Sequence, residues 1–157
     1  MPAKKPRPLW RCPKCGAQFV TPNMWHSCGK FTVEALFAKS LPQVVPLFEQ
    51  FGALVRKCGD EVVMIPQKTR AVFMGRVRFV GVYPRKDGFD AGLVFLRPII
   101  HARIVKHQFY VPCYHVNTVR ITAESDLDAT LLAWLRQSYA EYGRDGLQRP
   151  KPARGSD

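Results

Sequence analysis

The sequence has no run of apolar residues long enough to cross a membrane, although 46% of its residues are hydrophobic. The basic, proline-rich start MPAKKPRPLW is not followed by the apolar segment of a secretory signal. Internal repeats are also missing. We therefore expect a cytoplasmic protein with no membrane span and one modest core, since 157 residues suit a single domain with a small appendage.

Common catalytic motifs are missing as well. The sequence contains neither a glycine-rich phosphate loop nor a nucleophile elbow. Cys113 and His115 are two residues apart and would share one face of a strand, which makes them a possible nucleophile and base. No third residue is evident to orient the imidazole, so an enzyme is the less favoured interpretation. No role beyond structure is assigned to Cys58, His101 or His107.

Acidic residues are few. The chain has 24 Lys and Arg against 12 Asp and Glu, which gives a net charge of +12. Residues 1–33 carry six basic side chains and no acidic one. An excess of this kind favours a polyanionic partner, because Lys and Arg that meet phosphates release condensed counterions. Solubility alone is the alternative explanation.

Cysteine and histidine are concentrated near the N-terminus, in the segment RCPKCGAQFVTPNMWHSC. The spacing is Cys12-x2-Cys15-x10-His26-x-Cys28, and three thiolates with one imidazole match the closed tetrahedral sites of structural zinc. All four coordination positions are filled, so we expect one structural zinc ion and no catalytic role for it. A segment this short cannot fold without such a metal.

The predicted finger differs from the two-Cys, two-His fingers that read DNA bases. Those fingers place their second ligand pair three to five residues apart on a helix, whereas His26 and Cys28 are separated by one residue. We therefore assign no base-reading role. Phosphate contacts are expected from Arg11, Lys14 and Lys30, and the finger is also a possible site for a protein partner.

The rest of the chain alternates between helical and strand periodicity. We expect helices over 33–39 and from about Pro46 to Gly59, followed by a last helix capped by Ser125 with Leu127, Leu131, Trp134, Leu135 and Tyr139 on its buried face. Strands are expected at 62–65, 71–74, 77–83, 89–96, roughly 100–110 and 114–122. The predicted fold class is α+β: an antiparallel β-meander sheet with helices packed on one face, preceded by a small zinc-binding finger.

Three regions follow from these patterns: a basic arm and Cys3His finger over 1–30, an α+β domain over 31–142, and a disordered basic tail over 143–157. From about Leu36 to Tyr142 the chain resembles an uncharacterised bacterial family, the domain of unknown function 5655. The likeness lies in CGDEV, IPQKTRAVFMGRVRFVGVYPRKDG, Cys113-Tyr114-His115 and SDLDATLLAWLRQSYAEYG. Members often carry an N-terminal CPxCG…HxC finger too. The resemblance implies no established activity.

The strand region is the basic part of the predicted domain, with ten basic and two acidic residues between Lys68 and Arg120. We expect a nucleic-acid-binding module that contacts the phosphate backbone without strong sequence preference. Its candidate cations in the sheet are Lys68, Arg70, Arg76 and Arg78, and its candidate stacking surfaces are Tyr83, Tyr110 and Tyr114. A solvated sheet face, a small-ligand module and a protein-interaction adaptor remain as alternatives.

Overall fold

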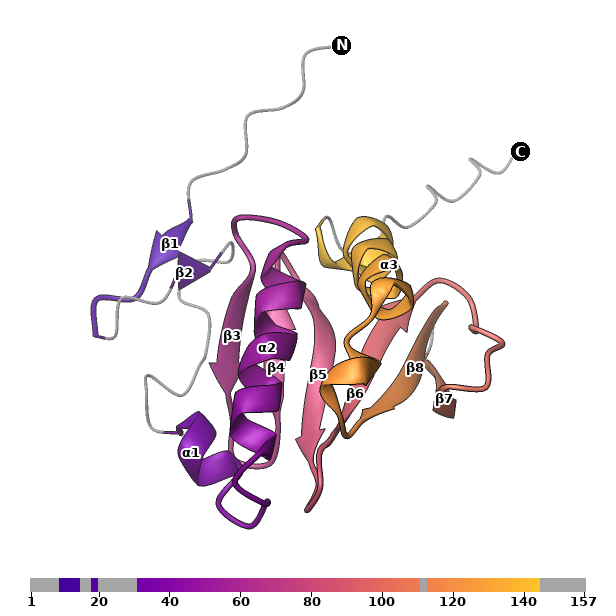
Figure 1. Ribbon diagram of the computed structural model, residues 1–157. Coiled ribbons are helices and arrows are strands. Elements are labelled where there is room, and N and C mark those ends of the chain that lie inside the picture. Colours follow the sequence, from indigo (N-terminus) through magenta and orange to yellow (C-terminus); the bar gives the residue numbers. More distant parts are fainter. Residues whose placement is uncertain (1–8, 15–17, 20–30, 111–112, 145–157) are drawn as a thin grey trace.

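The fold is described by a computed structural model for residues 9–14, 18–19, 31–110 and 113–144 (Figure 1). Strands β1 (Trp10–Arg11) and β2 (Gln18–Phe19) pair antiparallel near the N-terminus. The elements that follow are α1 (Val33–Leu36), α2 (Val44–Arg56), β3 (Val63–Pro66), β4 (Ala71–Met74), β5 (Arg78–Pro84), β6 (Phe89–Phe95), β7 (Ile104–Tyr110), β8 (Tyr114–Ile121), the short 3-10 helix η1 (Glu124–Asp126), α3 (Ala129–Ser138) and the π-helical turn η2 (Tyr139–Gly143).

Strands β3 to β8 form one antiparallel sheet in the order β3-β4-β5-β6-β8-β7. Strands β3 to β6 form a meander, as predicted. Strand β6 then pairs with β8, and β7 lies at the edge of the sheet, so the prediction of a full meander is wrong. The reason lies in the connections. Only three residues of sequence separate β7 from β8, which keeps these strands neighbours, whereas the longer connection 96–103 lets β7 lie on the far side of β8.

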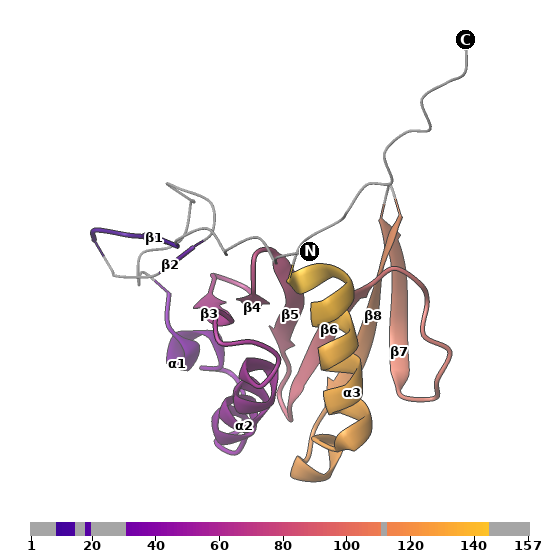
Figure 2. The same ribbon diagram turned by 90° about the horizontal axis from the view of Figure 1, so that it is seen from above.

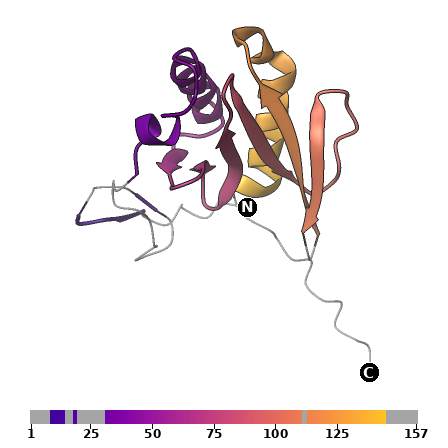
Figure 3. The same ribbon diagram turned by 90° about the horizontal axis from the view of Figure 1, so that it is seen from below.

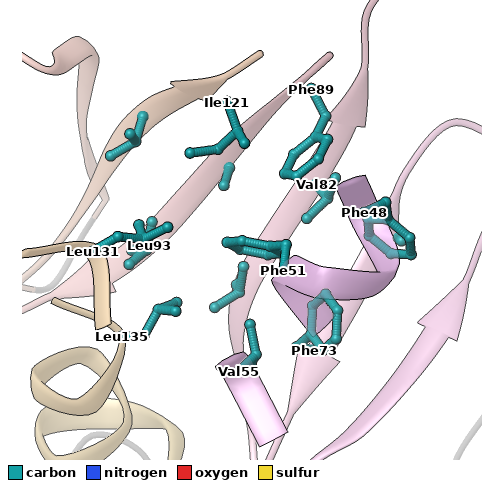
Figure 4. Packing of buried hydrophobic residues seen from close by; sticks show 14 of the residues in the cluster. Phe48, Phe51, Val55, Phe73, Val82, Phe89, Leu93, Ile121, Leu131 and Leu135 are labelled. Carbon is teal, nitrogen blue, oxygen red and sulfur yellow. The ribbon is translucent and has the colours of Figure 1, made fainter. Parts of the chain in front are cut away.

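Both long helices pack on the same face of this sheet, as Figures 2 and 3 show from above and below. Their apolar sides bury a cluster of aromatic and aliphatic side chains from α2, α3 and the strands (Figure 4). Phe89 contacts three other rings of this cluster, with ring centroids 5.2 Å from Phe51, 5.8 Å from Phe48 and 6.4 Å from Phe37. The α+β class with helices on one face is therefore confirmed, and the opposite face is left without a helix from the described residues.

The helix boundaries follow local chemistry. Thr32 caps α1 by accepting from the backbone N–H of Ala35 at 3.1 Å. Helix α2 begins at Val44, so Pro46 lies in its first turn, where a missing N–H does no harm. The predicted cap of the last helix is wrong. Asp128 caps α3 by accepting from Leu131 N–H, because Ser125 lies in the separate 3-10 turn η1.

The connection 96–103 is fixed on the helix side of the sheet. Arg103 donates to both carboxylate oxygens of Asp128 at 2.9 and 3.0 Å and to the backbone carbonyl of Asp126, and its guanidinium lies over the Trp134 ring. Asp128 therefore both caps α3 and holds the segment that leads into β7. Within the described residues, no helix is both long and apolar enough for a membrane span.

Candidate nucleic-acid interface

The open face of the sheet contains a hollow of about 520 Å³. Its floor is one row of residues that the strand register aligns across five strands: Val72, Gly81, Gly92, Thr118 and Lys106. Two neighbouring positions in the middle of this row are glycines. Neither glycine has a side chain above the sheet, but their surroundings differ, since Gly81 is partly exposed whereas Gly92 is buried beside the Val116 side chain.

Three cationic side chains line this hollow: Arg70 next to β4, Arg78 at the start of β5, and Lys106 on β7. Arg70 is held in place, since its Nε donates to Gln67 Oε1 at 2.9 Å and its Nη1 donates to the Tyr83 hydroxyl at 3.3 Å. The Nε of Arg78 is buried and has no hydrogen-bond partner among the described residues. A buried N–H group without an acceptor costs folding free energy. A hydrogen-bond acceptor on a ligand or a water molecule would remove this cost at Arg78.

Asp90 is the acidic side chain among the residues that line the hollow, and two arginines balance its charge. Arg120 Nε donates to Asp90 Oδ1 at 3.0 Å, and Arg85 Nη1 donates to Oδ2 at 3.4 Å. The hydrogen bond to Asp90 raises the pKa of Arg120 above its usual value. The hollow is therefore lined by more positive than negative charge, and the Asp90 carboxylate is hydrogen-bonded to two arginines.

Aromatic rings stand at both ends of the hollow. Tyr83 lines it from β5 and Tyr110 and Tyr114 from the β7–β8 hairpin, and the first two are exposed. Tyr110 and Tyr114 stack with centroids 5.6 Å apart, and Tyr142 of η2 stacks on Tyr114 at 5.5 Å. Burial raises the pKa of Tyr142. The arrangement offers flat apolar surfaces beside positive charge, which is the chemistry that single-stranded nucleic acids require.

The structure brings together half of the sheet cations named from the sequence. Arg70 and Arg78 line the hollow, whereas Lys68 is exposed in the β3–β4 bend. Arg76 lies in the turn before β5, where its backbone N–H donates to Gly143. Arg76 therefore lies outside the strand that carries Arg78, because β5 begins at Arg78.

Sequence reasoning missed Lys106 and the two floor glycines. The signals were present, since Lys106, Gln108 and Tyr110 alternate along β7, and an isolated glycine within a strand pattern marks a close approach of ligand or backbone. What the sequence did not reveal was the strand order that places β8 between β6 and β7, so that Thr118 lies between Gly92 and Lys106.

The predicted finger falls mostly outside the described residues, which is where Cys15, His26, Cys28 and Lys30 lie. Arg11 and Lys14 are exposed, and Cys12 is buried directly after β1. Strands β1 and β2 flank the Cys-x2-Cys segment as a short antiparallel pair. Among the residues that can be described, no group of three or more His, Cys, Asp or Glu side chains gathers as a metal site.

Cys113 and His115, the possible nucleophile and base, have separate surroundings. Cys113 is exposed in the turn before β8. The Nδ1 of His115 is 2.7 Å from Nε2 of His107, and the His115 ring also packs against the ring of Phe109. His101 packs edge-on against Trp134. Burial raises the pKa of Cys58 to about 11, so this thiol is poorly reactive at neutral pH.

These features define a small α+β domain whose helices cover one sheet face and whose other face is an open, basic, tyrosine-flanked hollow. Residues 33–141 match the family model described as a domain of unknown function (DUF5655). The chain belongs to this family. Comparison with curated proteins and with solved structures finds no match.

Proposed function

We propose that this protein binds nucleic acid through the open sheet face, contacting the phosphate backbone without strong sequence preference. One observation carries the proposal: three cations and three tyrosines, contributed by β5, β7, β8 and the residue before β4, converge on one hollow. Positive side chains supply attraction to phosphates, and the phenol rings supply surfaces on which bases of any sequence can stack. The orphan Nε of Arg78, which no described residue satisfies, adds a donor that a phosphate oxygen would engage.

The test is a salt titration of binding to a labelled oligothymidylate of about eight nucleotides. Wild-type affinity should fall steeply between about 50 and 300 mM salt. Arg78→Gln should weaken binding at low salt and reduce the slope of log Kd against log salt by about 0.7, the value for one phosphate contact with a single strand. Arg136→Gln removes the same charge from an exposed position of α3 and should change neither quantity.

A wild-type protein that does not bind the oligonucleotide at low salt would overturn the proposal. So would equal losses in the Arg78→Gln and Arg136→Gln variants, because these would reflect net charge and not the hollow.

A small anionic ligand is the second candidate, and the size of the hollow favours it. About 520 Å³ falls within the range of 300–1,000 Å³ that small-molecule sites occupy. Such a ligand would bind with weak salt dependence compared with a polyanion. Titration with a mononucleotide beside the oligonucleotide separates the two, since a mononucleotide site gains little from a longer chain.

We also propose that Cys12, Cys15, His26 and Cys28 hold one structural zinc ion. The spacing of the four ligands supports this, as do the burial of Cys12 and the β1–β2 pair that flanks the first two cysteines. The metal would fix the fold of the N-terminal segment and leave no open position for catalysis. The finger would add Arg11, Lys14 and Lys30 to the phosphate contacts of the sheet.

Elemental analysis of the purified chain tests the zinc proposal, with about one zinc per chain as the expected result. Cys15→Ala should release the metal and leave the unfolding of the α+β domain unchanged. A metal-free wild-type protein, or a Cys15→Ala variant that retains stoichiometric zinc, would contradict the site.

A further inference from the structure

The bare floor of the hollow is not required by the fold at Gly81. A Cβ atom built at this position would lie 3.8 Å from Tyr83 Cε2 and 4.0 Å from Arg70 Nη1, which are ordinary van der Waals distances. The backbone of Gly81 is also outside the left-handed region that favours glycine. Glycine weakens the interior of a strand. Because Gly81 lies at a position where the fold accepts a larger residue, we look for a functional reason for a glycine there.

Two other glycines, Gly88 just before β6 and Gly92 within it, differ in this respect. A Cβ atom at Gly88 would collide with the backbone carbonyl of Ile121, so the fold itself demands glycine there. At Gly92 a Cβ atom would lie 2.9 Å from Val116 Cγ1, which is closer than Cβ atoms approach in folded proteins, so the structure would have to shift there. Gly81 is the position of these three where a Cβ atom would make only ordinary van der Waals contacts, on the side of the sheet that lines the hollow.

The polar groups next to this floor point to the chemistry of its occupant. Arg70 Nη1 lies beside the empty Cβ position of Gly81, and Arg78 lines the same hollow with its buried Nε unsatisfied by any described residue. A flat ring can lie against bare backbone more closely than against side chains. Donors at its rim then suit the carbonyl and phosphate oxygens of a nucleotide.

We propose that the bare backbone at Gly81 is the seat of one unpaired base, so that the open face takes single strands and rejects duplexes. This inference rests on the proposed function and narrows its substrate class. A base inside a duplex is stacked and paired on both sides, and it reaches the floor of a hollow only after it has been flipped out. An unpaired base enters without that cost.

The positions of the tyrosines agree with a strand that passes over the floor. Tyr83 is one two-residue step from Gly81 along β5, and Tyr114 is two such steps from Thr118 along β8 on the other side of the floor row. Three steps of about 6.8 Å separate the two ends by roughly 20 Å. At about 3.4 Å per stacked nucleotide this corresponds to roughly six nucleotides, which sets the length of the probe.

The experiment measures Kd by fluorescence anisotropy at low salt for labelled single strands of about six to eight nucleotides of mixed sequence. The same strand annealed to its complement is the second probe. Three full-length variants are compared with wild type: Gly81→Ala, Gly81→Val and the control Gly52→Ala. The control residue lies on α2 away from the hollow, and a Cβ atom there also meets nothing closer than 3.5 Å.

We expect wild type to bind the single strand at least about ten-fold more tightly than the duplex, and Gly81→Val to lose about ten-fold or more of the single-strand affinity. Gly81→Ala should give a smaller loss, and Gly52→Ala should give none. Thermal melts of all variants report whether the fold is intact. The comparison of the two probes on wild type needs no variant, so it tests the inference even if Gly81→Val does not fold.

Equal affinity for the single strand and the duplex would overturn the base seat, as would a folded Gly81→Val variant with unchanged affinity. In both cases the salt dependence and the effect of Arg78→Gln would remain, so the proposed function would stand. A wild-type protein that binds neither probe would overturn both proposals together.

Discussion

Replacing Asp90 by Asn should tighten the binding of nucleic acid. Asp90 contributes negative charge to an otherwise positive hollow and accepts hydrogen bonds from Arg85 and Arg120. Asparagine has the same shape without the charge. The substitution removes repulsion toward phosphates and releases two guanidinium groups, while the sheet stays intact because exposed ion pairs of this kind contribute little to folding.

The size of the effect follows from elementary electrostatics. A unit charge acts on a phosphate about 4–7 Å away in water with roughly 0.6–1 kcal/mol, which is about a three- to fivefold change in Kd. Each released arginine that then engages a phosphate steepens the salt slope by about 0.7. Anisotropy titrations with the single-stranded probe at several salt concentrations measure both quantities.

Asp128→Asn is the matched control for this prediction. Asp128 also pairs with an arginine, Arg103, but it lies at the start of α3, and asparagine caps helices as well as aspartate does. Its binding curve should match that of wild type. The reasoning is refuted if Asp90→Asn binds no more tightly than wild type at low salt, or if Asp128→Asn gains as much affinity as Asp90→Asn.

Three further predictions concern the fold. Phe89→Ala should lower the free energy of unfolding by about 3–5 kcal/mol in a urea titration, since it removes a fully buried ring that contacts three other phenylalanines. The hydrogen bond from Leu131 N–H lowers the pKa of Asp128 below the usual aspartate value. A lowered folded-state pKa stabilises the protein above the unfolded-state pKa, and this stability is lost as the pH falls through the folded value. In urea titrations at several pH values, wild type should therefore be more stable than Asp128→Asn near neutral pH, and the difference should disappear in acid. Alkylation by iodoacetamide at neutral pH, mapped by mass spectrometry, should modify exposed Cys113 quickly and Cys58 only after unfolding, because burial raises the pKa of Cys58 to about 11.

The sequence was most informative where local chemistry decides the structure. The strand predicted over 71–74 matches β4 at both ends, because its apolar run is bounded by residues that cannot extend the pattern. The buried face of the last helix was also predicted, and Leu131 and Leu135 are fully buried. Its cap was not, because Ser125 and Asp128 are both good caps, and only the 3-10 turn over Glu124–Asp126 shows which one meets the helix.

The sequence was least informative about residues that meet through long-range pairing. Arg78 and Lys106 belong to strands that are not neighbours, since β6 and β8 lie between β5 and β7, yet both side chains line one hollow. Periodicity assigns each residue to a face of its own strand but does not say which strands are adjacent. Arg78 was therefore identified without its partner residues, and the glycine floor was not identified at all.

Strand β6 shows how one segment serves both the core and the proposed site. Phe89, Ala91 and Leu93 are buried under the helices, whereas Asp90 and Gly92 line the hollow on the opposite face. Because successive side chains of a strand point to opposite faces, the two roles alternate residue by residue. Substitutions at the first set should therefore lower the unfolding midpoint in urea at unchanged Kd per folded molecule, and Asp90→Asn should change Kd at an unchanged midpoint. Large changes of Kd from a folded Ala91→Gly or Leu93→Val variant would contradict this separation and would place the binding surface elsewhere than on the open face.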